Sequence, residues 1–159
     1  MKSHGEYLQD AIDYAIDNVR LNDGKPFGAL VVKHGEVIGV GMNEVLHTHD
    51  PTAHAEIQAL RKASSKLKSE FLEGCVIYAS AHPCPMCLAA IYLSGIRTVY
   101  YGSSLEQEAL HGFSVSHIYS EIGKPNEQRL YPLQQLHLDD AEKPFLVWKE
   151  VSNPSEFEP

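Results

Sequence analysis

The sequence has no long apolar segment and no excess of positive charge, and these absences exclude several classes of protein. No run reaches the ~18 uninterrupted apolar residues that a membrane span requires, and residues 1–6 lack the apolar core of a signal peptide. Lys and Arg number 13 against 21 Asp and Glu, for a formal net charge of -8. An acidic surface repels polyanions. We therefore expect a cytoplasmic protein with no membrane contact, for which nucleic acid is a disfavoured partner.

Cysteine is scarce, and the chain contains no internal repeat, low-complexity stretch or long linker. Three cysteines, an odd number, without an export signal argue against a disulfide framework and favour a metal-binding or catalytic role. At 159 residues, with 43% hydrophobic composition, the chain has the size and the apolar content of one globular domain. We therefore predict a single domain over residues 1–159.

The spacing of apolar residues predicts helices and strands in alternation. Between Tyr7 and Val19 they recur every three or four positions, as on one face of an amphipathic helix. Two β-rich runs, Ala29–Lys33 and Glu36–Met42, are joined by His34-Gly35, which predicts a hairpin. Asp50-Pro51 supplies a capping side chain and a first-turn proline, so the next helix is predicted to start there.

The second half of the chain continues this alternation. The predicted strands are Gly74–Ala79, Arg97–Tyr101 and Leu133–Leu138. The predicted helices are Pro83–Ser94, Leu105–His111, Val115–Ile122 and Pro144–Val151. Such alternation implies an α/β fold with three α/β/α layers. We expect a mixed but mostly parallel five-stranded sheet, with the N-terminal antiparallel hairpin at its edge and helices on both faces.

Two short segments carry the residues expected to bind a metal. They are His54-Ala55-Glu56 and Pro83-Cys84-Pro85-Met86-Cys87, each at the start of a predicted helix. Cysteines three apart at a helix start lie on one face, where the helix dipole and a cation favour the thiolate. Soft sulfur with one imidazole selects zinc. His54, Cys84 and Cys87 are therefore the predicted ligands of one zinc ion per subunit, with the fourth tetrahedral position open to water.

Glu56 is the predicted catalytic residue. Residues two apart on a regular helix face nearly opposite ways, so Glu56 and His54 can reach one ion only if it lies just beyond the helix N-terminus. There Glu56 can take a proton from a zinc-activated water and return protons to a ring nitrogen and a leaving amine. The predicted reaction is hydrolytic loss of ammonia. The alternative is a structural zinc clip whose fourth ligand is His47, His49, Cys75 or His82.

The pair of patterns H-x-E and P-C-x-x-C is the signature of zinc-dependent nucleobase deaminases. On this pair the sequence resembles the cytidine and deoxycytidylate deaminase superfamily, and within it the bacterial guanine deaminases. Further resemblance lies in Lys25–Ala29, Asn43, Asp50–Glu56, Pro83–Leu88, Ala90–Tyr92 and Ile118-Tyr119. The resemblance implies a zinc-dependent amidine hydrolase that releases ammonia from a free purine base or nucleoside, with guanine as the first choice.

The same resemblance implies which residues contact the substrate and how the chain assembles. It places Phe27 beside the base, and Asn43 and the backbone of Ala55 in hydrogen bonds with it. Phe113 and His82 are the other expected substrate-site residues. The resemblance also implies a homodimer in which the C-terminal segment, residues 140–159, is exchanged between subunits.

Two positions depart from the guanine deaminase pattern. Guanine deaminases have an acidic pair after Gly-Phe, where this chain has Ser114-Val115, and a Glu before Pro-Cys, where it has His82. A carboxylate after Gly-Phe would accept hydrogen bonds from the ring N–H and amine of guanine, and Val115 cannot. Unpaired donors in a dry pocket cost about 1 to 3 kcal/mol each. Alternatives are therefore cytosine, adenine, an isocytosine-like base or a pterin as substrate, a tRNA adenosine deaminase, and a catalytically silent zinc-stabilised interaction module.

Overall fold

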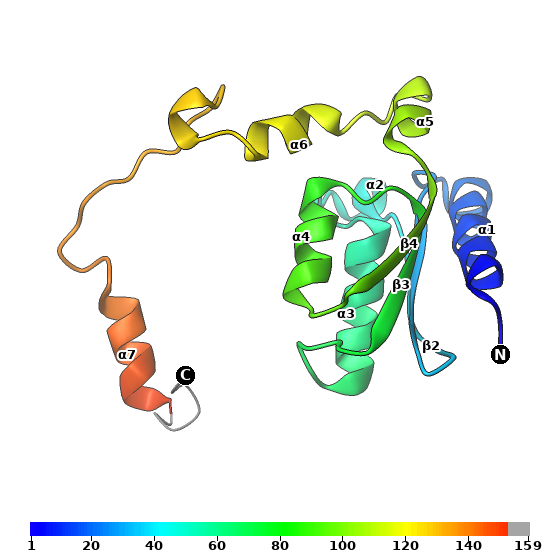
Figure 1. Ribbon diagram of the computed structural model, residues 1–159, viewed down its shortest axis with the longest axis horizontal. Helices are drawn as coiled ribbons and strands as arrows, with labels where there is room; N and C mark the ends of the chain where they lie inside the picture. Colours follow the sequence, from blue (N-terminus) through cyan, green and yellow to red (C-terminus); the bar gives the residue numbers. More distant parts are fainter. Residues whose placement is uncertain (153–159) are drawn as a thin grey trace. The chain divides into compact units, whose positions relative to one another are not determined.

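In the computed structural model, residues 1–123 form a four-stranded sheet with helices on both faces (Figure 1). The strands follow the order β2-β1-β3-β4 and span Gly28–Lys33 (β1), Glu36–Met42 (β2), Cys75–Ala81 (β3) and Thr98–Ser103 (β4). The long helices are α1 (His4–Asn22), α3 (Ala55–Leu67) and α4 (Pro85–Leu93), and the short ones are α2 (Val45–Thr48), α5 (Leu105–Leu110) and α6 (Ser116–Ile122). The structure describes residues 1–152, of which residues 124–152 belong to a second unit.

The predicted three-layer α/β/α arrangement is confirmed by two apolar clusters on opposite faces of the sheet. Strand β1 is buried on both faces, which explains its continuous apolar run. On one face, Leu30 and Val32 of β1 and Tyr78 of β3 form a cluster with Tyr7 and Ala11 of α1. The opposite cluster, which includes α3 and α4, contains Ala29, Val31, Ile38, Ala55, Ala59, Leu60, Ala63, Leu72, Cys75, Ile77, Ile91 and Ile96.

The predicted five-stranded, mostly parallel sheet is wrong in strand number and in direction. Within the described residues the sheet has four strands, and β1 pairs antiparallel with both β2 and β3, whereas only β3 and β4 are parallel. The alternation of helix and strand fixes the direction of consecutive strands, but it does not determine which strands lie next to one another in the sheet. Because β1 lies between β2 and β3, the helical crossover through α3 does not produce a parallel pair there.

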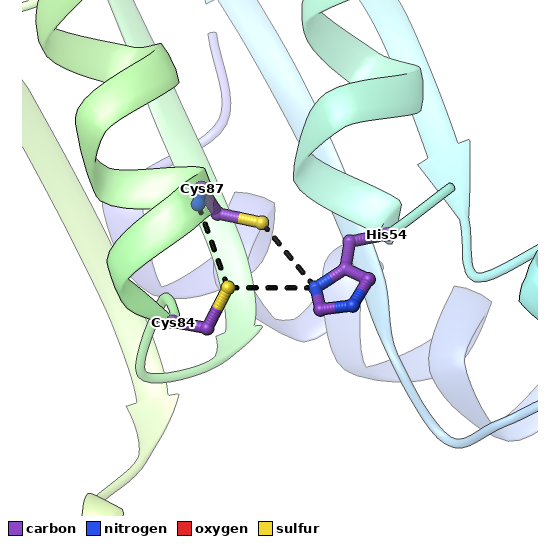
Figure 2. Close-up of side chains that lie close together, drawn as sticks. All are labelled: His54, Cys84 and Cys87. Atoms are coloured by element: carbon purple, nitrogen blue, oxygen red, sulfur yellow. Dashed lines mark hydrogen bonds between the residues drawn. The ribbon is translucent and has the colours of Figure 1, made fainter. Parts of the chain in front are cut away.

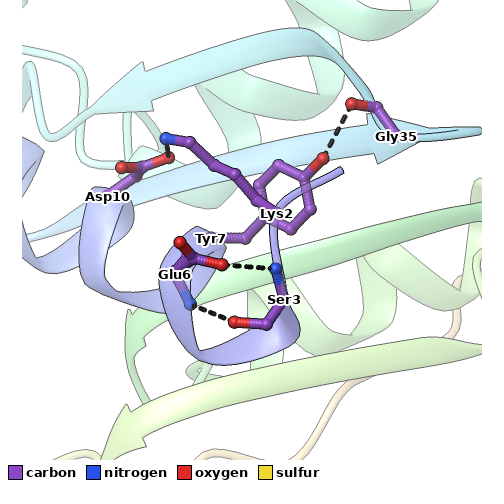
Figure 3. A network of polar contacts seen from close by, with 6 residues as sticks. All are labelled: Lys2, Ser3, Glu6, Tyr7, Asp10 and Gly35. Carbon is purple, nitrogen blue, oxygen red and sulfur yellow. Dashed lines mark hydrogen bonds and ion pairs between the residues drawn. The ribbon is translucent and has the colours of Figure 1, made fainter.

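The predicted hairpin is confirmed, and a contact with α1 holds its turn in place. His34 and Gly35 both have positive φ, 49° and 81°, as two-residue hairpin turns require. The Tyr7 hydroxyl donates a hydrogen bond of 2.7 Å to the Gly35 carbonyl (Figure 3). Helix α1 begins in a capping box, in which Ser3 Oγ accepts from the Glu6 N–H and the Glu6 carboxylate accepts from the Ser3 N–H.

The predicted helix start at Asp50-Pro51 is wrong, because the Asp50 side chain caps a local turn instead. Its Oδ1 accepts hydrogen bonds of 2.8 Å from the Thr52 N–H and 2.7 Å from the Thr52 hydroxyl. Short Asp side chains readily satisfy nearby backbone in this way. Helix α3 therefore begins at Ala55, with His54 as an N-cap in extended conformation.

Two glycines allow α3 to lie directly on β2. A Cβ at Gly41 would lie 2.0 Å from the Ala55 carbonyl oxygen, and one at Gly39 would lie 2.4 Å from the Ala59 carbonyl oxygen. Both distances are far below van der Waals contact, so no other residue fits at these positions without moving the helix. This close packing fixes the N-terminus of α3, which carries His54, at the end of β2.

The unit that begins at Lys124 contains two short helices and no sheet among its described residues, 124–152. They are η1 (Asn126–Gln128) and α7 (Lys143–Val151), the second of which was predicted. The predicted strand Leu133–Leu138 is wrong: this segment pairs with no strand, and Leu133, Leu136 and Leu138 are exposed. Apolar alternation makes a strand only where a ladder satisfies the backbone. The exchange of residues 140–159 stays a prediction, and residues 153–159 lie outside the described part.

No helix within residues 1–152 is both long enough and apolar enough to cross a membrane.

Candidate metal centre and active site

Two helix N-termini bring one imidazole and two thiols together (Figure 2). His54 is the N-cap of α3, and Cys84 is the N-cap of α4, followed by Pro85 in the first helical position. Cys87 lies one turn into α4, and its N–H donates to the Cys84 sulfur over 3.4 Å. The three side chains come from segments 30 residues apart in the sequence and point toward one another. Within residues 1–152 they form the one group of metal-ligating side chains.

The spacing of these donor atoms fits a zinc ion. The sulfur atoms of Cys84 and Cys87 each lie 3.5 Å from Nδ1 of His54, and all three atoms lie within 4.8 Å of one another. Zinc bonds of about 2.3 Å to sulfur and about 2.0 Å to nitrogen, at tetrahedral angles, separate the two atom types by about 3.5 Å. The donor set could therefore hold zinc without rearrangement, and it leaves one of four positions free of protein ligands.

The electrostatics of the group favour a cation. The hydrogen bond from the Cys87 side chain, with help from His54, lowers the pKa of Cys84 to about 4, so that Cys84 is a thiolate at neutral pH. Sharing that hydrogen bond raises the pKa of Cys87, and burial adds to the shift. The hydrogen bond with Cys84 raises the pKa of His54. A divalent cation would displace the remaining proton and make both sulfurs thiolates.

Glu56 lies next to this group. Because His54 is an extended N-cap rather than part of the first helical turn, its side chain and that of Glu56 reach the same place. Glu56 Oε2 accepts from the Cys87 sulfur at 3.5 Å, and Cys87 in turn is 3.5 Å from His54. The Glu56 side chain is buried, and this desolvation raises the pKa of its carboxyl group to about 7. A carboxyl group near pKa 7 both accepts and releases protons at neutral pH.

A cavity of about 240 Å³ opens beside the donor group and Glu56. This volume lies just below the range of most small-molecule sites, ~300 to 1,000 Å³. Its walls combine the predicted site residues with positions that the sequence had not singled out. The lining consists of Lys25, Phe27, Asn43, His54, Glu56, His82, Cys84, Glu108, Phe113, Ser114 and Val115.

Aromatic side chains lie in and around the wall of this cavity. Phe27 and Phe113 meet edge to face, with ring centroids 5.2 Å apart at an interplanar angle of 88°. His82 packs against Tyr101 and donates from Nδ1 to the Pro83 carbonyl over 2.9 Å. The Tyr119 hydroxyl donates to the same carbonyl, and burial raises the pKa of Tyr119 to about 12.

Asn43 combines two roles that the sequence could not separate. Its Oδ1 accepts from the Val45 N–H at 3.1 Å, as in a turn that ends a hairpin, and the residue also lines the cavity. The buried Asn18 donates to the Asn43 carbonyl over 2.9 Å and so ties this turn to α1. Ala55, by contrast, is buried in the first turn of α3 and does not line the cavity with its side chain.

The alternative ligands of a structural zinc clip do not join the metal group. Within residues 1–152, neither His47, His49, Cys75 nor His82 lies with His54 and the two cysteines. Cys75 is buried in β3, where desolvation raises its thiol pKa. Lys25 and Glu108 also line the cavity, although no sequence pattern predicted either of them as a site residue. Lys25 lies two residues before Phe27, in a segment that already resembles the family, and this position could have indicated it. Glu108 has the sequence context of an ordinary residue on a helix surface.

Comparison with known proteins places this site in a family. Residues 1–103 match the cytidine and deoxycytidylate deaminase zinc-binding region. The chain is 41% identical to guanine deaminase of Bacillus subtilis over 155 residues, which cover 98% of this chain and 99% of that relative. The crystal structure of guanine deaminase from Bacillus subtilis matches 96% of this chain and 97% of its own, with a TM-score of 0.90. A tRNA-specific adenosine deaminase of Aquifex aeolicus is 38% identical over 115 residues, 69% of this chain and 74% of that relative.

These likenesses include the site as well as the fold. The matched region, residues 1–103, contains His54, Glu56, Cys84 and Cys87 and all four strands of the sheet. It also contains the H-x-E and P-C-x-x-C patterns on which the resemblance was first recognised. The predicted resemblance is confirmed. The chain belongs to the cytidine and deoxycytidylate deaminase family.

Proposed function

We propose that the protein is a zinc-dependent guanine deaminase, which hydrolyses guanine to xanthine and ammonia. The observation that carries this proposal is the opening of a zinc-compatible His-Cys-Cys group and a buried carboxyl group, Glu56, onto one small cavity with aromatic walls. The likeness to guanine deaminase of Bacillus subtilis extends over nearly the whole chain and favours guanine among the possible bases.

The proposed mechanism assigns the metal to three ligands and the protons to Glu56. His54, Cys84 and Cys87 would hold zinc, which acidifies a water molecule enough to make it a nucleophile at neutral pH. Glu56 takes the proton of the attacking water and delivers it to the ring nitrogen next to the carbon that carries the amine. A second proton, passed by the same carboxyl group, converts the amine into ammonia as its bond to carbon breaks. The oxygen of the water stays on the ring carbon.

The proposed substrate contacts follow from the lining of the cavity. Phe27 and Phe113 supply apolar walls for a flat ring, as aromatic side chains do for free bases. Asn43 and the backbone N–H of Ala55 supply hydrogen bonds to the base, and His82 closes the cavity near Cys84. A helix N-terminus has unsatisfied N–H groups in its first turn, and α3 has no side-chain cap bond, so the Ala55 N–H suits this role.

A panel of compounds, assayed by ammonia release, tests the function. The zinc-loaded protein is expected to release ammonia faster from guanine than from adenine, cytosine, isocytosine, a pterin or guanosine. A faster release from any other compound would replace guanine as the substrate and leave the deaminase assignment intact. Zinc binding with no ammonia from any compound would favour the silent interaction module and contradict the proposed function.

The similarity to tRNA-specific adenosine deaminases makes tRNA the competing substrate. The formal net charge of -8 opposes it, because a protein that neutralises several phosphates usually presents a basic surface. We expect no tRNA retention in a filter-binding assay at low salt. Tight binding that weakens steeply with added salt would instead support tRNA editing.

We further expect a homodimer that exchanges its C-terminal segment. Helix α7 is exposed along its whole length, including Phe145, which is 68% exposed, and Leu146. Apolar residues gathered in this way mark an interface, and a second copy of the chain is the partner expected.

Light scattering should give twice the mass of one chain, and Phe145→Glu should shift the measured mass toward that of one chain. Lys149→Glu, an exposed position on the same helix, is the matched control and should leave the dimer intact. A monomeric wild-type protein would contradict this expectation.

A further inference from the structure

One carboxyl group in the cavity has no role in the proposed chemistry. Glu108, on α5, is only 7% exposed, and its Oε1 is buried without a hydrogen-bond partner. Within residues 1–152 it is the sole buried side-chain oxygen or nitrogen in this condition. Burying a carboxyl oxygen without a partner is unfavourable, and native proteins rarely do so. The exception requires an explanation, and a ligand that supplies the missing donor is the simplest one.

The position of Glu108 is fixed by the start of its helix. Ser104 Oγ accepts from the Gln107 N–H at 3.2 Å, and the Gln107 side chain accepts from the Ser104 N–H at 2.9 Å, which makes a capping box. Helix α5 begins two residues after the end of β4, so the box fixes where the helix starts relative to the end of that strand. Glu108 is thereby held at the cavity wall rather than free on the surface.

Glu108 shares its cavity with the reacting groups and with the aromatic walls. It lines the same 240 Å³ space as Glu56, His54, Phe27 and Phe113. Burial raises the pKa of the Glu108 carboxyl group, while the charge and the backbone of His82 oppose that shift. Terminal carboxyl torsions are broad, so either oxygen can turn toward a ligand. Glu108 therefore combines a buried oxygen that lacks a partner with a position on the wall of the cavity in which a substrate is expected.

The segment after Phe113, which also lines the cavity, offers no charged hydrogen-bond acceptor. Val115 has no polar side-chain atom, and Ser114 offers only a neutral hydroxyl. A carboxylate accepts hydrogen bonds and donates none, so it favours a base that presents N–H groups over one that presents a bare ring nitrogen. Guanine has N–H groups on its six-membered ring edge, where adenine has an unprotonated nitrogen. Glu108 thus supplies the acceptor that Ser114 and Val115 lack.

We propose that Glu108 is a substrate-specificity residue whose carboxylate accepts a hydrogen bond from an N–H group of the bound base. This inference rests on the proposed function, because it assumes that a purine base occupies the cavity. It assigns the selection of guanine over adenine to α5 rather than to the segment after Phe113. Glu108 binds the base and holds no metal, since it is not part of the His54, Cys84 and Cys87 group.

Glu108→Gln and Glu108→Ala test the inference. For guanine, kcat/KM is expected to fall about 10- to 100-fold, the usual effect of losing a hydrogen bond to a charged group. Zinc content should stay at one ion per chain, and the melting temperature should stay constant or rise, because a buried carboxyl oxygen without a partner is removed. Glu106→Gln, an exposed position on the same helix, is the matched control and should change nothing. A lower melting temperature with unchanged kcat/KM would show a purely structural residue and overturn the inference.

Methylated bases identify the contact itself. Wild-type protein and Glu108→Gln are compared on guanine and on its 1-, 7- and 9-methyl derivatives, each of which lacks one N–H group. We expect the gap between the two proteins to close for 1-methylguanine, which lacks the six-membered-ring N–H that adenine also lacks, and to persist for the 7- and 9-methyl derivatives, which lack the imidazole N–H. A gap of the same size for guanine and all three derivatives would overturn the inference.

A binding measurement separates this inference from the proposed function. If the wild-type protein releases no ammonia from guanine, the proposed function fails. Calorimetric titration with 8-azaguanine, a guanine analogue, then tests Glu108 independently of turnover. A Kd that rises about tenfold or more in Glu108→Gln supports the contact, and an equal Kd in the two proteins overturns it.

Discussion

Replacing Glu56 with alanine or glutamine should leave zinc bound and reduce ammonia release from guanine by about 10²- to 10⁴-fold, the range attributed to a positioned proton carrier. Glu56 is buried, and the donor atoms that could hold zinc do not include it. Its removal therefore takes away the proton carrier without taking away a metal ligand. The measurements are kcat from ammonia release and the zinc-to-protein ratio from elemental analysis.

Glutamine is the sharper of the two substitutions. It keeps the volume and one acceptor of Glu56 but cannot take up a proton, so it separates proton transfer from packing. Binding of 8-azaguanine should change much less than kcat, because the lost group acts on the reaction more than on the bound base. Undiminished ammonia release by either variant would remove Glu56 from the mechanism.

Replacing Cys84 or Cys87 with alanine should lower zinc affinity on the order of 100-fold, and activity should fall with the zinc content. The binding free energy of a four-ligand zinc site, about 10 to 16 kcal/mol, corresponds to about 3 kcal/mol for each ligand. The loss should also lower thermal stability, because a metal that binds the folded chain stabilises it. Dialysis against a series of chelators of increasing zinc affinity, followed by measurement of the zinc that stays bound, measures the change in zinc affinity.

Cys75 provides the matched control for this experiment. It is the third cysteine of the chain, and it lies buried in β3 outside the metal group. Cys75→Ala should keep one zinc ion per chain and lose only the modest stability expected for truncating a small buried side chain. Equal loss of zinc from all three variants would contradict the assignment of His54, Cys84 and Cys87 as the ligands.

Local patterns in the sequence were sufficient to predict which side chains lie together in the metal group. Two cysteines three apart at a helix start, and a histidine two before a glutamate, carry their geometry with them, because a helix N-terminus fixes where such side chains can point. The spacing of His54 and Glu56 even required an ion beyond the helix end. The observed N-cap position of His54 meets that requirement.

Long-range contacts explain the errors in the fold. Leu133, Leu136 and Leu138 alternate as a strand would, yet the described residues offer them no partner. Asp50 has the sequence features of a helix cap, yet its side chain satisfies Thr52 instead. In both cases the local pattern was compatible with two structures, and the surroundings selected one.

By itself the sequence determined most of the helices and strands of residues 1–123, the residues that could hold a metal and the class of chemistry, because each of these depends on patterns within short segments of the chain. Only the tertiary structure decided which strands are neighbours and which side chains face the cavity. Glu108 illustrates the difference. It is buried at the wall of a cavity that distant segments of the chain form together, and no spacing within the helix distinguishes it from its exposed neighbour Glu106.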